Sequence, residues 1–138
     1  MFFGVPVLHP VYSPDKPLGY LVVQLPAERF TALMTADGNW QDIGLGATGD
    51  AYLVAADGRL ITEPRPMLTQ GEQTLAKLDL SVQQPELQQD MQRYQALSGR
   101  YRFESPAVQH AVAGESGLGQ MVNPFGTTVL MSWQPLQI

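Results

Sequence analysis

The chain has 138 residues, 44% of them hydrophobic, which is enough to bury the core of one domain of ordinary size. Its net charge is -5, and its 8 Lys and Arg residues come no closer to a cluster than Arg100 and Arg102, which argues against nucleic acid and anionic membrane surfaces as partners. The chain contains no cysteine, which excludes disulfides and thiolate metal sites and fits a periplasmic or a cytosolic location equally well.

No apolar run approaches the roughly 20 residues that span a bilayer, and the first residues lack the regions of a signal peptide. The sequence begins and ends abruptly, within or beside strand-like segments, so we interpret it as a domain of a longer protein. We expect a single domain over residues 1–138. It would consist of an N-terminal strand pair (1–26), a short helix and loop (27–43), and a core with the remaining elements (44–138).

The first segments predict two strands and a helix. Residues 3–12 are apolar but interrupted by Pro6 and Pro10, which is typical of an edge strand or an extended arm. Residues 18–25 are β-branched and aromatic and predict a strand. In residues 27–35 the apolar side chains follow a helical spacing, so a short helix is expected there.

The strongest local signal is a hairpin within residues 44–65. A short apolar run at 51–55 is followed by the turn Asp57-Gly58 and a returning run at 59–62. Asp-Gly between two β-prone runs favours a tight turn, since glycine tolerates positive φ. We therefore expect the central hairpin of an antiparallel sheet.

The glycines at 44, 46 and 49 formally match a dinucleotide-binding pattern. That pattern needs a strand before it and a helix after it, so that the pyrophosphate meets the helix N-terminus. Here a polar loop precedes and a strand follows, which argues against a nucleotide site. The alternative is that these glycines shape the approach to the hairpin.

The second half predicts further helices and a final strand pair. Ser105 before Pro106 is a helix N-cap signal. The expected segments are a loop at 64–71, one or two helical turns at 72–80, a helix at 85–97, a short strand at 100–104, a helix at 107–113, and strands at 118–122 and 127–133. Hairpins with helices inserted between them predict an α+β domain, a mainly antiparallel sheet of about five strands with helices on one face.

Catalytic and metal signals are missing from the sequence. The only histidines, His9 and His110, are far apart, and Ser116 lies in a turn rather than on a strand-to-helix elbow. Asp50 and Asp57 occupy turns, where Asp commonly caps backbone groups. We expect no catalytic residues, no metal and no cofactor, and no enzymatic activity.

Aromatic side chains are the better candidates for a site. A concave sheet face under helices, with a few aromatics and an arginine, is a common small-ligand pocket, although each aromatic taken alone is better explained as core. Arg65 could hold a carboxylate or cap a loop carbonyl. The aromatics that flank the expected sheet are Trp40, Tyr52, Tyr101, Phe125 and Trp133.

Three blocks of the sequence resemble one family. Residues 46–58 (Gly-Ala-Thr-Gly-Asp-Ala-Tyr-Leu-Val-Ala-Ala-Asp-Gly), 111–117 (Ala-Val-Ala-Gly-Glu-Ser-Gly) and 125–136 are similar to the extracytoplasmic Cache (PAS-like) sensor domains of bacterial chemotaxis transducers and related cyclases and kinases. The N-terminal residues 10–25 resemble the strand pair of these domains. The chain departs from the pattern at Ala47, where the family has an acidic residue. It departs again after the hairpin, where only Arg65 remains of an Arg/Ser-rich segment.

The resemblance implies a ligand-sensing, non-enzymatic domain of a membrane-bound receptor. It implies a periplasmic location, with membrane helices of the parent protein outside this sequence, and a small-molecule ligand held by Tyr52, Arg65, Trp133 and Trp40. The family's last strand is missing after Leu136, so the last sheet position is expected to be empty or filled by residues 18–25. A homodimer is also possible. The alternative functions are a structural spacer or dimerisation module without ligand, and a small hydrolase-type enzyme.

Overall fold

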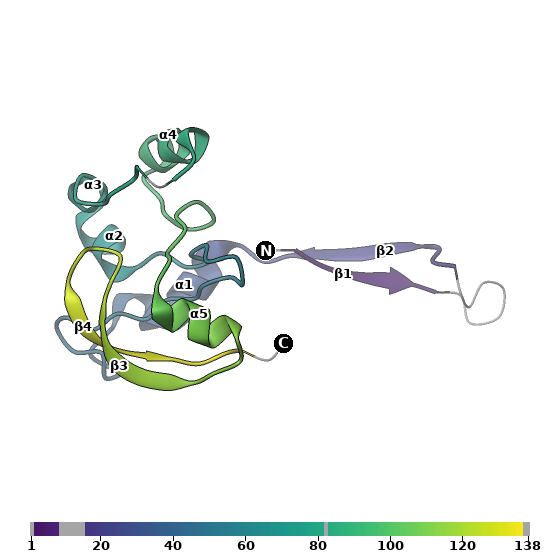
Figure 1. Cartoon of the computed structure of the whole chain (residues 1–138). Helices are drawn as coiled ribbons and strands as arrows, with labels where there is room; N and C mark the ends of the chain where they lie inside the picture. Colours follow the sequence, from purple (N-terminus) through teal and green to yellow (C-terminus); the bar gives the residue numbers. More distant parts are fainter. Residues whose placement is uncertain (1, 9–15, 82, 137–138) are drawn as a thin grey trace.

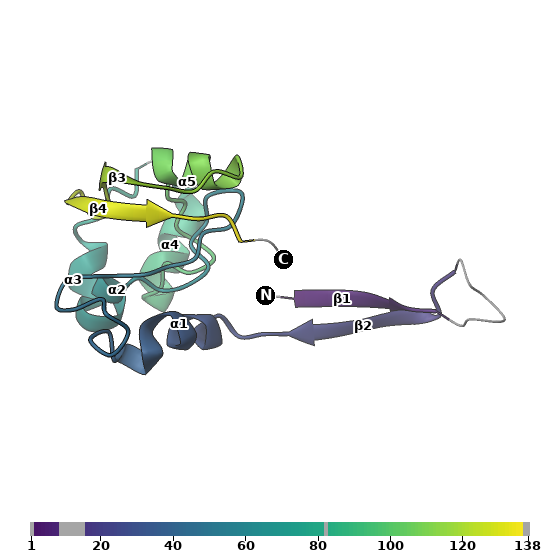
Figure 2. The same cartoon turned by 90° about the horizontal axis from the view of Figure 1, so that it is seen from below.

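The computed structural model describes residues 2–8, 16–81 and 83–136, and it shows a helical body from which one hairpin projects (Figures 1 and 2). Part of the expected segment 3–12 lies outside the described residues. The elements in chain order are β1 (Phe2–Val7), β2 (Gly19–Gln24), α1 (Ala27–Thr35), the 3-10 turn η1 (Ala36–Gly38), α2 (Arg65–Gln70), α3 (Glu72–Leu75), α4 (Pro85–Tyr94), α5 (Pro106–Val112), β3 (Gly117–Val122) and β4 (Thr128–Trp133).

The expected sheet of about five strands is wrong. The described strands form two separate two-stranded antiparallel sheets, β1 with β2 and β3 with β4. Because β2 pairs only with β1, it does not fill a sheet position beside β4. The described residues do combine helices and antiparallel strands, and the main helix-on-sheet packing among them is that of α5 against β3 and β4.

The central hairpin forms its turn but hardly any ladder. Gly58 adopts the expected positive φ of 86°, and a single bridge joins Val54 to Leu60. Beyond the bridge, the Leu53 N–H donates across the hairpin to the side-chain oxygen of Thr62, at 2.9 Å, instead of to a backbone carbonyl. A side chain thus takes the place of the ladder, and Pro64 follows two residues later.

The short strand expected at 100–104 is reduced to a single antiparallel bridge between Arg59 and Arg102. The buried amide of Gln83 brackets Arg102, donating to its carbonyl at 2.9 Å and accepting from its N–H at 3.0 Å. The Leu60 N–H donates to the carbonyl of Tyr101 at 3.0 Å on the other side. The Gln83 side chain thus satisfies the backbone edge of Arg102 that faces away from the bridge, and no further strand pairs there among the described residues.

Several local predictions are confirmed, and two need correction. The helix over 27–35 is α1, and Ser105 caps α5 by accepting from the Val108 N–H at 3.2 Å. The helix expected to run to residue 97 ends at Tyr94, because Gln95 turns left-handed with a φ of 50°. The loop expected at 64–71 contains α2, whose Pro66 lies in the first turn, where no backbone donor is needed.

The core lies among α2, α3, α4 and the irregular chain beside them, rather than under a sheet. Its fully enclosed members, Leu60, Met91 and Leu97, are 0% exposed. Phe125 and Met131 of the C-terminal hairpin reach it only in part. The buried core cluster consists of Leu60, Met67, Leu75, Leu78, Met91, Leu97, Tyr101 and Phe103.

Candidate functional site

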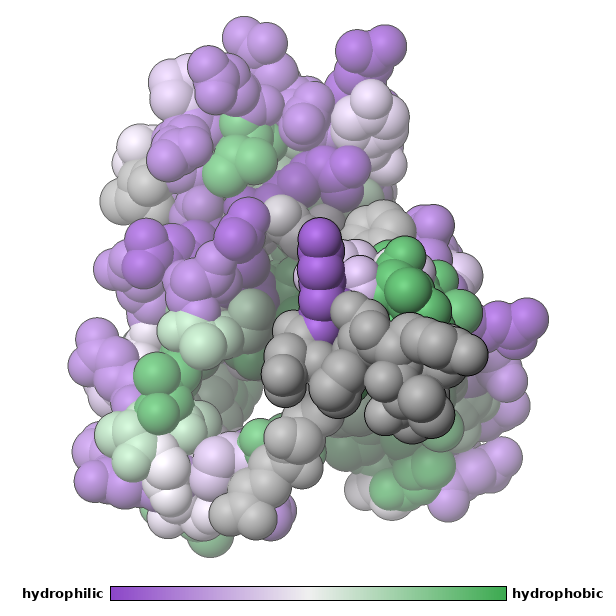
Figure 3. Space-filling model, turned by 90° about the vertical axis from the view of Figure 1, so that its right-hand side faces the viewer, coloured by the Kyte–Doolittle hydropathy of each residue, from purple (hydrophilic) through white to green (hydrophobic). Residues whose placement is uncertain are grey.

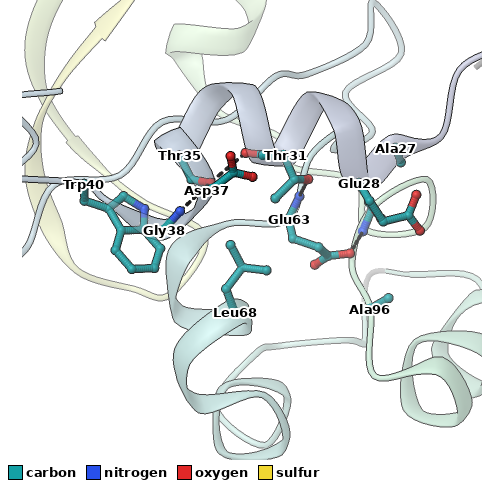
Figure 4. Close-up of a pocket in the computed structure, with 12 residues that line it drawn as sticks. Ala27, Glu28, Thr31, Thr35, Asp37, Gly38, Trp40, Glu63, Leu68 and Ala96 are labelled. Atoms are coloured by element: carbon teal, nitrogen blue, oxygen red, sulfur yellow. Dashed lines mark hydrogen bonds between the residues drawn. The ribbon is translucent and has the colours of Figure 1, made fainter. Parts of the chain in front are cut away.

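A pocket of about 450 Å³ opens between α1 and the chain around Glu63, Leu68 and Ala96 (Figure 4). One face of α1 forms a wall, because residues three or four positions apart in a helix share a face. The wall is made of small side chains, which leave the space open. The α1 residues of this wall are Ala27, Glu28, Thr31, Ala32 and Thr35.

The two threonines of this wall are buried and fully engaged. Thr35 Oγ1 donates to the Thr31 carbonyl at 2.8 Å, and Thr31 Oγ1 accepts from the Glu63 N–H at 3.0 Å. Hydroxyls that bond to backbone in this way are satisfied without water. They hold the helix against the opposite wall and leave ligand contacts to other side chains.

Glu63 forms the opposite wall and joins three parts of the chain. Its two carboxylate oxygens accept from the Leu97 N–H at 3.0 Å and the Ser98 N–H at 2.7 Å. Together with the bond from its own N–H to Thr31, it connects α1 to the segment after α4 (Figure 4). Glu63 therefore has a structural role, and its negative charge adds to the charge of the pocket.

The side chains that line this pocket carry only negative charge. Glu28 and Asp37 are exposed carboxylates near the two ends of α1, and no Lys, Arg or His belongs to the lining. The last turn of α1, whose carbonyl end attracts cations, also has no basic residue of its own. The electrostatics of the pocket thus favour a positively charged group.

Two of the four predicted site residues come together at one end of the pocket. The Arg65 guanidinium carbon lies 4.3 Å from the centre of the Trp40 ring, a cation–π contact. Trp40 lines the main pocket and, with Arg65, an adjoining smaller one of about 270 Å³. Arg65 does not end a hairpin strand as expected, since it is the first residue of α2.

The guanidinium of Arg65 is already engaged with the glycine-rich loop. Its Nη1 donates to the carbonyls of Gly46 at 2.9 Å and Gly49 at 3.1 Å, and its backbone N–H donates to Asp50 Oδ2 at 2.9 Å. Of the two roles left open for this arginine, the structure shows the capping of loop carbonyls. The glycines of the loop turn the chain, and no helix follows them.

The other two predicted residues, Tyr52 and Trp133, lie outside both pocket linings. Tyr52 packs edge-on against Phe103, with ring centres 6.1 Å apart, and burial raises the pKa of its hydroxyl, with a smaller contribution from the nearby Asp50 charge. Trp133 stacks on His110 at 5.7 Å. In this structure Tyr52 and Trp133 hold the fold together.

Trp40 retains one unused polar group. Its indole Nε1 is buried and has no hydrogen-bond partner among the described residues, and the same holds for Trp133. Buried donors are normally paired, so these two indole N–H groups are exceptions among the described residues. The sequence reasoning found Trp40 but missed Thr31 and Glu63. The available signal was the i, i+4 spacing of small residues in α1.

Within the described residues, no group of three or more His, Asp or Glu side chains is arranged to hold a metal ion. None of the helices in the same part of the chain combines the length and apolar character needed to cross a membrane. Comparison with protein-family models, curated proteins and solved structures gave no match.

Proposed function

We propose that this chain binds, without turnover, a small molecule that joins a positive charge to an apolar body, and that it does so as the sensing part of a signalling receptor. The observation that carries the proposal is the pocket along α1. Its volume of about 450 Å³ lies in the range of roughly 300–1,000 Å³ that is usual for small-molecule sites.

The lining supports the chemical class of the ligand. Alanines, Leu68 and the Trp40 ring supply apolar contact, while Glu28 and Asp37 supply negative charge that is free of ion pairs among the described residues. The carboxylates attract an ammonium group, while the Trp40 ring, on which Arg65 already stacks, supplies apolar contact.

The short connection between the pocket and the β1–β2 hairpin supports a sensing role. α1 is one wall of the pocket, and only Leu25 and Pro26 separate it from β2. A ligand that prefers one position of α1 would bias the position of the β1–β2 hairpin as well. The resemblance to sensor domains extends the proposal to an extracytoplasmic domain of a membrane receptor whose spanning helices belong to other parts of the protein.

The test is a thermal-shift and calorimetry series with amines, each matched to the alcohol and carboxylate of the same skeleton, such as benzylamine, benzyl alcohol and benzoate. Selective binding to the folded protein raises Tm with ligand concentration. We expect saturable shifts with amines alone, weakened at high salt because the carboxylates are exposed.

Variants identify the pocket as the site. Glu28→Gln combined with Asp37→Asn should weaken amine binding several-fold, whereas Glu86→Gln on α4, away from the pocket, should leave it unchanged. Equal shifts with all three members of each set, or no shift with any amine at millimolar concentration, would contradict the proposal. The second result would favour a spacer without ligand.

A further inference from the structure

The β1–β2 hairpin, called the arm here, exposes many large apolar side chains. Figure 3 looks at the side of the molecule from which the arm projects, and hydrophobic residues are visible on that side. The arm extends away from the body in both ribbon views, and neither strand contains a charged residue (Figures 1 and 2). Two-stranded sheets are at best marginally stable alone in water, and exposed apolar patches usually mark contact sites. The exposed large apolar side chains in and beside the arm are Val5, Val7, Leu8, Leu18, Tyr20, Leu21, Val22, Val23 and Leu25.

One face of the arm is entirely aliphatic where its side chains are described. Paired residues and residues two apart share a face, and Val5 pairs with Leu21. This face, called the arm face, comprises Val5 (60% exposed), Val7 (46%), Leu21 (60%) and Val23 (47%).

The body has a sheet face that is also uncharged and is partly apolar, and no described helix covers it. The inner face of β3–β4, which includes Trp133, packs toward α5. Half-buried and exposed residues therefore alternate along both strands. The outer face has Leu118, Val122 and Leu130 exposed at 66%, 55% and 71%. The polar residues Ser132, Thr128 and Gln120 pair with these three across the strands. This outer face has no charged residue.

The joint between arm and body is short and stiff. β2 ends at Gln24 and α1 begins at Ala27, so two residues connect them. The second is Pro26, with φ -62° and ψ 141°, and proline also restricts the residue before it to extended conformations. A short, stiff hinge disfavours folding the arm back on its own body and favours exchange with another copy.

We propose that the chain forms a reciprocal dimer in which the arm face of each copy covers the outer β3–β4 face of the other. In a two-fold pair, each arm face covers the outer β3–β4 face of the other copy, so one arrangement covers both faces of both copies. A partner of different sequence would need two separate surfaces, one for each face. Since both faces are uncharged, two chains of net charge -5 meet where their own charges are absent.

The area that the two contacts would bury reaches the size range of specific dimers. Fully burying a Val or Leu side chain removes roughly 60–120 Å² of apolar surface from water. The seven side chains of one contact are each about half exposed or more, so two contacts bury roughly 500–1,000 Å² of apolar surface. With apolar atoms forming about 60% of an interface, the total is roughly 800–1,700 Å², which overlaps the roughly 1,200–2,000 Å² of specific complexes.

The first test is sedimentation velocity over a range of protein concentrations. We expect a concentration-dependent dimer that is weakened at least tenfold by Leu21→Lys or Leu130→Lys, because each places a charge in the apolar contact. Leu33→Lys, at a side chain 78% exposed on α1, is the matched control and should leave the dimer unchanged. Circular dichroism verifies that each variant is folded, as expected for exposed positions.

The second test locates the contact and uses the absence of cysteine from the chain. Leu21→Cys and Leu130→Cys chains are mixed and treated with a short bismaleimide. Reciprocal exchange predicts a crosslinked pair containing one chain of each kind. A chain that carries both substitutions, Leu21→Cys and Leu130→Cys, is treated in the same way. The proposal would be overturned if the protein stays monomeric at all concentrations, if the chain with both cysteines crosslinks only within itself, or if neither lysine variant affects the dimer. All three results leave the amine-binding test intact.

Discussion

The two hairpins of this protein have the same size and opposite surroundings. Each pairs two six-residue strands through six residue pairs, yet β3–β4 alternates between half-buried and exposed positions while β2 is exposed at every residue after Gly19. The difference lies in what covers them. α5 lies on one face of β3–β4. By contrast, none of the described helices, nor the other hairpin, packs closely on the arm.

This comparison explains their sequences. Alternation of apolar and polar residues suits a strand with one face in water, whereas nearly continuous apolar runs suit strands covered on both faces. Residues 19–24, Gly-Tyr-Leu-Val-Val-Gln, are of the second kind. β2 therefore has the sequence of a strand that is covered on both faces, although the described residues leave it exposed. A second copy of the chain would supply the missing cover.

The largest expected effect separates the body from the arm. Leu60→Ala removes a side chain that is 0% exposed in the core and should lower the free energy of unfolding by about 2–5 kcal/mol. Leu21→Ala in the arm should cost less than about 0.5 kcal/mol in dilute monomeric protein, because the side chain is already exposed. Urea denaturation of both variants measures this. Equal losses would show that the arm is buried in solution.

Glycines give a second, intermediate contrast between the hairpins. A Cβ at Gly117 would overlap the indole of Trp133, so Gly117→Ala should destabilise by about 1–3 kcal/mol. Gly119→Ala on the same strand meets the ring only at 3.6 Å and is the matched control. Gly19→Ala in the arm meets nothing within 4 Å and should be neutral or slightly stabilising. Thermal melts rank the three, and a neutral Gly117→Ala would contradict the packing of Trp133.

Short-range signals predicted the local structure well. β2, the strands of the C-terminal hairpin, α1 and the Ser105 cap follow from β-branched runs, helical spacing and capping chemistry, all of which act within a few residues. The Asp57-Gly58 turn is of the same kind. Among the predicted site residues, Trp40 was chosen as an aromatic flanking the expected sheet and Arg65 as the arginine at the mouth of the hairpin, and these two lie together.

Long-range bonding could not be predicted from these signals. Thr62 replaces a ladder bond to Leu53, and Gln83 brackets Arg102 from 19 residues away. Such pairings depend on where the chain returns in space, and the pattern of apolar residues does not encode them. The role of Glu63 was missed for the same reason, since its partners Leu97 and Ser98 lie more than 30 residues later.

The smallest effect is a pH dependence that belongs to the body, since β1 and β2 contain no carboxylate. Burial raises the pKa of Asp50 above its value in the unfolded chain, so the folded state holds its proton more tightly. The stabilising contribution of that proton is fully present below the unfolded pKa of about 3.9 and is lost as pH rises through the raised folded pKa. Asp50→Asn should remove this decline in urea-unfolding measurements.

Asp57 provides the control of opposite sign. Its hydrogen bond and ion pair with Arg59 lower the pKa of the Asp57 carboxyl, so its contribution is present above the unfolded pKa and is lost as pH falls through the folded one. The Asp57→Asn variant should therefore lose stability relative to the parent at neutral pH and not at low pH. The same pH slope in both variants would show that the burial of Asp50 is wrong.

Amide hydrogen exchange at two protein concentrations tests the contrast between the hairpins most directly. In dilute protein we predict rapid exchange of the arm amides at residues 20–23 and slow exchange in β3–β4, because only the latter is covered by α5. At high concentration the protection of the arm should rise as the dimer forms. Arm amides that are already protected in dilute protein, or that stay unprotected at every concentration, would contradict the account.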